Sequence, residues 1–180
     1  MKRWNSVSRV ALIAAGVLCV SACEEPKVDV ATYQTLQQCL ADINMVRSDC
    51  EKNHAAARQQ HASVAPKFAS ARECEEEFGR ARCEKAPQTT SSGGSMFMPL
   101  MMGYMMGSMI GGRGYGNAQP LYRTRKDPGT FRTADNKSAG RSVGRTQVAK
   151  SSTARPTAKR SSRSRGGFGS SGRRFGSAAT

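Results

Sequence analysis

The feature that most constrains how this chain can fold is a pair of similar segments, each carrying a cysteine at the same place. YQTLQQCLADI starts at Tyr33 and FASARECEEEF starts at Phe68, and the two align with an offset of 35 residues. In each, a hydroxyl residue stands two positions after the aromatic residue, and a cysteine follows four positions later. A further cysteine follows each segment, so the sequence predicts a unit made of two related halves.

Both halves begin with a signal for a short helix. Thr35 and Ser70 stand where helix N-caps are expected, and Gln38 and Glu73 follow three residues later, which completes two capping boxes. Gly79 is placed to end the second helix in a left-handed cap. Between the halves, a segment rich in Ala, Arg and Gln predicts a third helix from about residue 50 to residue 64, stopped by a proline at position 66.

The N-terminus is typical of an export signal. A basic stretch is followed by VALIAAGVLCV, residues 10–20, whose helix would span about 16 Å, roughly half of a ~30 Å hydrocarbon core. VSAC, residues 20–23, resembles the lipobox of bacterial lipoproteins, in which the cysteine, here Cys23, becomes lipidated. Glu24 follows in place of the Asp that retains such proteins in the inner membrane, which favours the outer membrane. An ordinary secretory signal or an uncleaved anchor is the alternative.

Export into an oxidising compartment predicts that the remaining cysteines form disulfides. These are Cys39, Cys50, Cys74 and Cys83, and four cysteines allow three pairings. The repeat favours Cys39–Cys50 with Cys74–Cys83, and the nested pairing Cys39–Cys83 with Cys50–Cys74 remains open.

A metal site is the competing interpretation of the same region. Cys50, His54 and His61 share one face of the predicted middle helix, but no C-x₂-C pair is present. We therefore interpret the two histidines as solvated helix residues and predict no metal and no cofactor.

Seven of the nine methionines lie in SMFMPLMMGYMMGSMIGG, residues 95–112. This segment is too short to span a bilayer unaided. Gly103, Gly107 and Gly111 recur every fourth residue, a small-xxx-small pattern that predicts a helix-packing face. We expect a helix that self-associates or enters the membrane interface. Alternatives are a hydrophobic segment packed on the disulfide domain, and a thioether site for Cu(I).

The C-terminal part carries most of the basic charge. Residues 113–180 hold sixteen Lys and Arg residues and only two acidic residues. The whole chain has a net charge of +15. With few large apolar residues, this part is predicted to be disordered. We expect it to contact anionic lipid, lipopolysaccharide or acidic cell-wall polymers rather than nucleic acid, or to act only as a spacer.

Several blocks together resemble one family. The lipobox, YQTLQQC, APKFASARECEEEFG, FMPLMMGYMMG, QPLYR and RGGFG occur in the same order in the YgiB-like lipoproteins of enterobacteria. This resemblance implies an envelope lipoprotein and no known chemistry, because the family is a domain of unknown function.

These observations predict a small all-α disulfide-stapled domain, a Gly/Met-rich hydrophobic helix and a long disordered basic tail. The expected division is a signal peptide (1–22), a linker (23–32), the disulfide domain (33–86), a linker (87–95), the Gly/Met-rich segment (96–112) and the tail (113–180). No catalytic constellation is visible, so we expect a structural or adaptor role at the outer membrane and no enzymatic activity. The alternative is a metal-handling role through the methionines.

Overall fold

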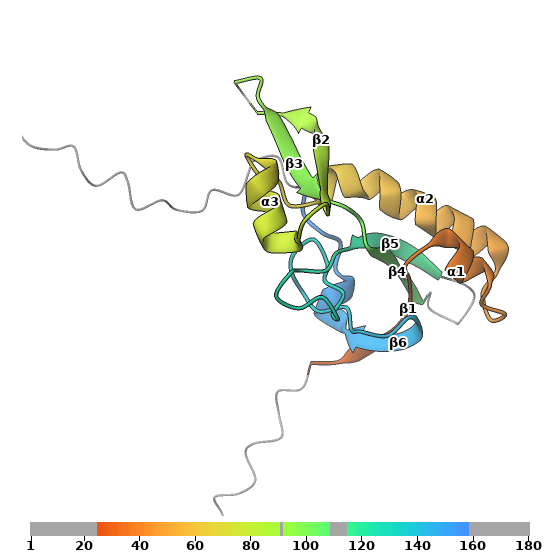
Figure 1. Ribbon diagram of the computed structural model, residues 1–180. Helices are drawn as coiled ribbons and strands as arrows, with labels where there is room; N and C mark the ends of the chain where they lie inside the picture. The colour runs from red at the N-terminus through yellow and green to blue at the C-terminus, as the bar shows by residue number, and fades with distance from the viewer. Residues whose placement is uncertain (1–24, 91, 109–114, 159–180) are drawn as a thin grey trace, which may run out of the picture.

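A four-stranded antiparallel sheet forms the centre of the molecule (Figure 1). The computed structural model describes residues 25–90, 92–108 and 115–158. The sheet order is β5–β4–β1–β6, with β1 Lys27–Tyr33, β4 Gly103–Ser108, β5 Tyr115–Leu121 and β6 Gly144–Ala149. A separate hairpin pairs β2 Cys83–Thr89 with β3 Ser95–Pro99.

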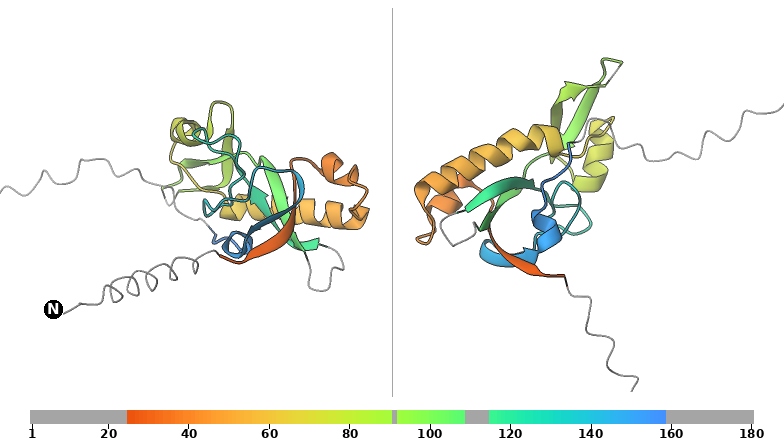
Figure 2. Two further views of the ribbon diagram at one scale, coloured as in Figure 1. Left: turned by 90° about the horizontal axis from the view of Figure 1, so that it is seen from below. Right: turned by 180° about the vertical axis from the view of Figure 1, so that it is seen from behind.

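The helices α1 Leu36–Leu40, α2 Arg47–Val64 and α3 Ala71–Phe78, with the short 3₁₀ turn η1 Lys150–Thr153, surround these sheets. Seen from behind, α2 lies across β5 (Figure 2). None of the helices in the described ranges is both long enough and apolar enough to cross a membrane.

The predicted helix starts are confirmed. The hydroxyl oxygens of Thr35 and Ser70 accept hydrogen bonds from the backbone three residues later, each at 3.2 Å. The return bonds reach one residue further back than a standard capping box: Gln38 accepts from the amide of Gln34, and Glu73 accepts from the amide preceding Ser70. The middle helix begins earlier than predicted, at residue 47, and ends before the proline as expected.

Two disulfides join Cys39 to Cys50 and Cys74 to Cys83, which is the pairing that the repeat favoured. The first ties α1 to α2, and the second ties α3 to the start of β2. The halves therefore share their beginnings but not their ends, because the second cysteine lies in a helix in one half and in a strand in the other.

The central strands of the large sheet are buried on both faces. One face packs under α1 and α2 through Ala31, Tyr33, Tyr104, Met106 and Ala118. The opposite face is covered by the connection between β5 and β6, and its core contains Val30, Met105, Leu121, Phe131 and Val148. A third cluster, between α3 and the β2–β3 hairpin, holds Phe68, Cys74, Phe78, Met98 and Tyr122.

The prediction of an all-α domain is wrong, because two antiparallel sheets organise the chain. β1 occupies most of the stretch that was expected to be a linker after the anchor. Its backbone pairs with β4 on one side and with β6 on the other, so the predicted helical unit is one layer on a sheet.

The predicted Gly/Met-rich helix is also wrong, because residues 95–99 form β3 and residues 103–108 form β4. Gly103 and Gly107 lie in β4 and line no helix face, and Gly111 lies outside the described residues. Two successive methionines, Met105 and Met106, are both buried because each face of β4 is covered by a different layer. The apolar run therefore has no alternation that would have distinguished a strand from a helix.

The tail prediction is wrong for residues 115–158, which contain β5, β6 and η1. Several large apolar residues of this part lie in the core, among them Leu121, Tyr122, Phe131 and Val148. β5 pairs with β4, and β6 pairs with β1. This pairing uses backbone hydrogen bonds, which the amino-acid composition does not reveal. Residues 159–180 lie outside the described residues.

Candidate functional site

A polar groove of about 500 Å³ opens where α2 passes the end of β1 and the start of β2. His54, Arg58 and His61 come from one face of α2, because residues spaced by three and four positions are neighbours on a helix. Glu84 of β2 and Met101 from the connection before β4 face them.

His61 is the centre of a buried hydrogen-bonded chain. Its Nδ1 lies 2.9 Å from the hydroxyl of Tyr122, and its Nε2 lies 3.0 Å from Oε1 of Glu84. A carboxylate only accepts, so in neutral His61 the Nε2 proton is donated to Glu84 and Nδ1 accepts from Tyr122. All hydrogen-bonding positions of the ring are thereby satisfied.

Burial shifts the pKa values of His61 and Tyr122 in this hydrogen-bonded chain. It lowers the pKa of His61 below its ordinary value, although the hydrogen bond to Glu84 acts in the opposite direction. Burial, aided by the negative charge of Glu84, raises the pKa of Tyr122, which keeps its hydroxyl protonated at neutral pH. The interpretation of His61 as a solvated helix residue is therefore wrong, since its side chain is buried.

His54 lies on the more open side of the groove. Its ring meets the ring of Tyr104 edge to face, with centroids 5.3 Å apart. Burial and the neighbouring charge of Arg58 lower the pKa of His54. The hydroxyl of Tyr104 is buried and has no hydrogen-bond partner among the described residues, and burial raises its pKa to about 12.

The metal-ligand face on α2, which was the competing interpretation, does not assemble. Cys50 is bonded to Cys39, and the described residues contain no group of three or more His, Cys, Asp or Glu side chains that could hold a metal ion. The methionines are separated as well: Met106, Met98 and Met105 belong to three different core clusters. This separation offers no support to a thioether site for Cu(I).

The groove depends on residues that sequence reasoning missed. Glu84 and Tyr122 lie 23 and 61 positions from His61. The one available signal for Glu84 is its place directly after Cys83, whose bond to Cys74 holds the start of β2. Cys23, the predicted lipidation site, lies outside the described residues.

The chemistry of the groove favours binding. His61 is held by two partners, Glu84 is engaged by it, and the cysteines of this region are in disulfides. The arrangement offers a cation at Arg58, a neutral imidazole at His54 and an apolar surface at Met101. Such a lining is suited to contacts with polar groups, and the described residues that form it include no activated nucleophile.

We expect acidification to destabilise the protein through His61. The unfolded histidine takes up a proton near its ordinary pKa of about 6.5, whereas the folded one resists it. The free energy of unfolding should therefore fall as the pH drops from 7.5 through 6.5 towards 5. Urea denaturation should show a smaller fall for His61→Gln than for the natural chain. An equal fall in both proteins would contradict this assignment.

Comparisons with known proteins find uncharacterised bacterial relatives. A family model described as a protein of unknown function, DUF1190, matches residues 27–178. A UPF0441 protein of Erwinia tasmaniensis is 36% identical, covering 94% of this chain and 84% of the relative. UPF0441 proteins of Serratia proteamaculans and Yersinia pestis bv. Antiqua are 35% and 36% identical, with the same coverage. No solved structure matches the chain.

Proposed function

Because this chain belongs to the DUF1190 family, whose function is unknown, we propose its role from its own residues: an outer-membrane lipoprotein, anchored through Cys23, with a structural or adaptor role at the cell envelope. The role is non-catalytic. The lipobox supports the anchor, and Glu24 supports the outer membrane.

The observation that carries this proposal is how few residues separate Cys23 from the first hydrogen bonds that hold the chain to η1. The carboxylate of Glu25 accepts hydrogen bonds from the backbone amide and the hydroxyl of Ser151. The amide of Lys150 donates to the carbonyl of Pro26 at 2.8 Å. The chain is therefore fastened to η1 two residues beyond Cys23, and two residues span at most about 7 Å. A lipid on Cys23 holds this end of the sheet against the bilayer surface.

The polar groove lies at the other end of β1. This strand has seven residues and is about 20 Å long at ~3.3 Å per residue. It starts beside η1 and ends at Tyr33, next to the groove residue Gln34. A short anchor at one end of a rigid strand and a binding groove at the other suits an adaptor that presents a surface to a partner away from the membrane. The basic residues 159–180 add a second contact, with anionic lipid, lipopolysaccharide or cell-wall polymer.

Cys23→Ala should abolish labelling with a palmitate analogue, because the acceptor thiol is lost. Continued labelling of this variant would refute the anchor. Glu24→Asp should move the lipidated protein from the outer to the inner membrane on a sucrose gradient, while Glu24→Gln, the matched control, should leave it in the outer membrane. If Glu24→Asp stays with the outer membrane, or if the natural chain already sediments with the inner membrane, the proposed location is wrong.

A further inference from the structure

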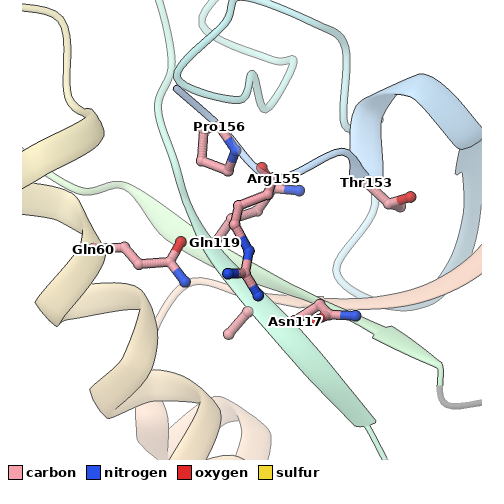
Figure 3. A pocket seen from close by; sticks show the side chains of 7 residues that line it. Gln60, Asn117, Gln119, Thr153, Arg155 and Pro156 are labelled. Atoms are coloured by element: carbon pink, nitrogen blue, oxygen red, sulfur yellow. The ribbon is translucent and has the colours of Figure 1, made fainter. Parts of the chain in front are cut away.

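A second, smaller pocket lies on a different side of α2 from the polar groove. It has a volume of about 240 Å³ and is lined by residues of α2, β5, η1 and the segment after η1. Figure 3 shows the guanidinium group of Arg155 lying over β5, between Gln60 of α2 and Asn117. Thr153 and Pro156 close the side formed by the C-terminal segment.

Two amide oxygens in this pocket are buried without partners. Oε1 of Gln60 and Oε1 of Gln119 have no hydrogen-bond partner among the described residues. Gln119 is only 2% exposed, and its Nε2 donates to the carbonyl of Ser152 at 2.8 Å. That bond determines the orientation of the amide group and leaves its oxygen as an acceptor. A buried acceptor without a donor is unfavourable, so the pocket is suited to a ligand that brings N–H groups.

The same pocket carries one positive charge. Arg155 forms no hydrogen bond or ion pair with any described residue, and the residues that line the pocket include no carboxylate. A guanidinium group presents paired N–H donors that match the two oxygens of a carboxylate. The pocket therefore offers donors for an anion beside acceptors for an N–H group.

We propose that this pocket binds the end of an amino-acid chain: a free carboxylate, held by Arg155, with an N–H group on the adjacent carbon, held by Gln119 and Gln60. A volume of about 240 Å³ is below the ~300 Å³ of a drug-sized site, which suits one or two residues. The C-terminal residue of a peptide and a free amino acid share this chemistry. They differ in the nitrogen, which is an amide in the first and an ammonium group in the second.

The pocket is formed beside η1, the same turn that binds Glu25. Ser151 of η1 binds Glu25, and Ser152 of η1 binds Gln119. The hydroxyl of Ser152 also donates to the carbonyl of Ser138, which fixes the turn from its other side. The proposed ligand therefore binds near the anchored end of the sheet, and the site does not depend on the proposed anchor.

Saturation-transfer NMR on the full-length protein in detergent tests the proposal with four probes. N-acetylalanine carries the carboxylate and an amide N–H, alanine carries the carboxylate and an ammonium group, alanine amide lacks the carboxylate, and acetate lacks the N–H. We expect N-acetylalanine or alanine to bind with a Kd of millimolar or tighter, and the stronger of the two identifies the source. We expect alanine amide and acetate to bind at least tenfold more weakly. No binding of either carboxylate-bearing amino acid at 10 mM, or equal binding of acetate, would overturn the proposal.

Variants assign the binding to this pocket. Arg155→Gln should weaken binding at least tenfold, and Arg155→Lys should have an intermediate effect. Arg155 is exposed, so both substitutions should leave the core unchanged. Gln60→Leu should also weaken binding, whereas Gln59→Leu, one residue earlier and exposed on the same helix, should not. Circular dichroism confirms that each variant is folded. Unchanged binding in Arg155→Gln would place the ligand elsewhere and overturn the assignment.

Discussion

Gly103→Ala should lower the free energy of unfolding by about 1–3 kcal/mol, the usual cost of forcing an extra methyl group into a packed core. A Cβ at Gly103 would lie 2.8 Å from the carbonyl oxygen of Tyr33 and 3.1 Å from a ring carbon of Phe131. The first neighbour is backbone of the adjacent strand β1, so a side-chain rotation cannot relieve the overlap. β1 and β4, the two inner strands of the sheet, would have to separate where β1 ends and β4 begins.

Gly107→Ala is the matched control for this substitution. A Cβ at Gly107 has its nearest neighbour at 3.7 Å, the carbonyl oxygen of Gly116, which is an ordinary contact. We expect a change within about 0.5 kcal/mol, as for most substitutions that create no clash. Urea denaturation of both variants measures the difference. Equal effects would contradict the sheet arrangement, because they are what a shared helix face predicts.

Removing either disulfide should also lower the free energy of unfolding by a large amount. The closed loops span 11 and 9 residues, for which the chain-entropy model gives about 2.5–3 kcal/mol each. Replacing Cys39 and Cys50 together by alanine should lower the free energy of unfolding by more than this. Both cysteines are completely buried in the core between the helices and the sheet, so the substitution also leaves a cavity.

Replacing Cys74 and Cys83 together by alanine should cost less, since Cys83 is only partly buried. This pair has a second expected effect, because the bond holds the strand that carries Glu84. The pH dependence assigned to His61 should change in this variant and stay unchanged when the other disulfide is removed. Denaturant titrations of the oxidised natural chain and both double variants supply the comparison. A loss below about 1 kcal/mol in both variants would show that neither disulfide supports the fold.

Much of the local structure was predictable because its causes lie within a few residues. Thr35 and Ser70 cap helices through hydroxyl groups that reach the backbone three positions away. The disulfides follow from the same locality, since each joins cysteines of one half across a short loop. The family resemblance is also confirmed, and it depends on short blocks of residues that occur in a set order.

The strand β4 was missed because burial on both of its faces removes the alternation of apolar and polar residues. Met105 and Met106 point to opposite faces of β4, and both are buried. Met105 lies in the core cluster of Phe131, and Met106 lies in the cluster of Tyr104. A composition count also missed the C-terminal strands, because β5 and β6 are ordered by pairing with β4 and β1 as much as by their own side chains. The candidate sites were unpredictable in the same way, since His61, Glu84 and Tyr122 meet only after α2 packs beside both sheets.

By itself, the sequence determined the helix caps and the family of the chain, and it favoured the observed cysteine pairing without excluding the nested one. These depend on contacts between residues close in the chain, or on the order of short motifs. Only the tertiary structure decided that the glycine- and methionine-rich segment is part of a sheet. It also brought Glu25 to Ser151 and Gln60 to Gln119, because contacts between residues far apart in the chain are set by how the layers pack.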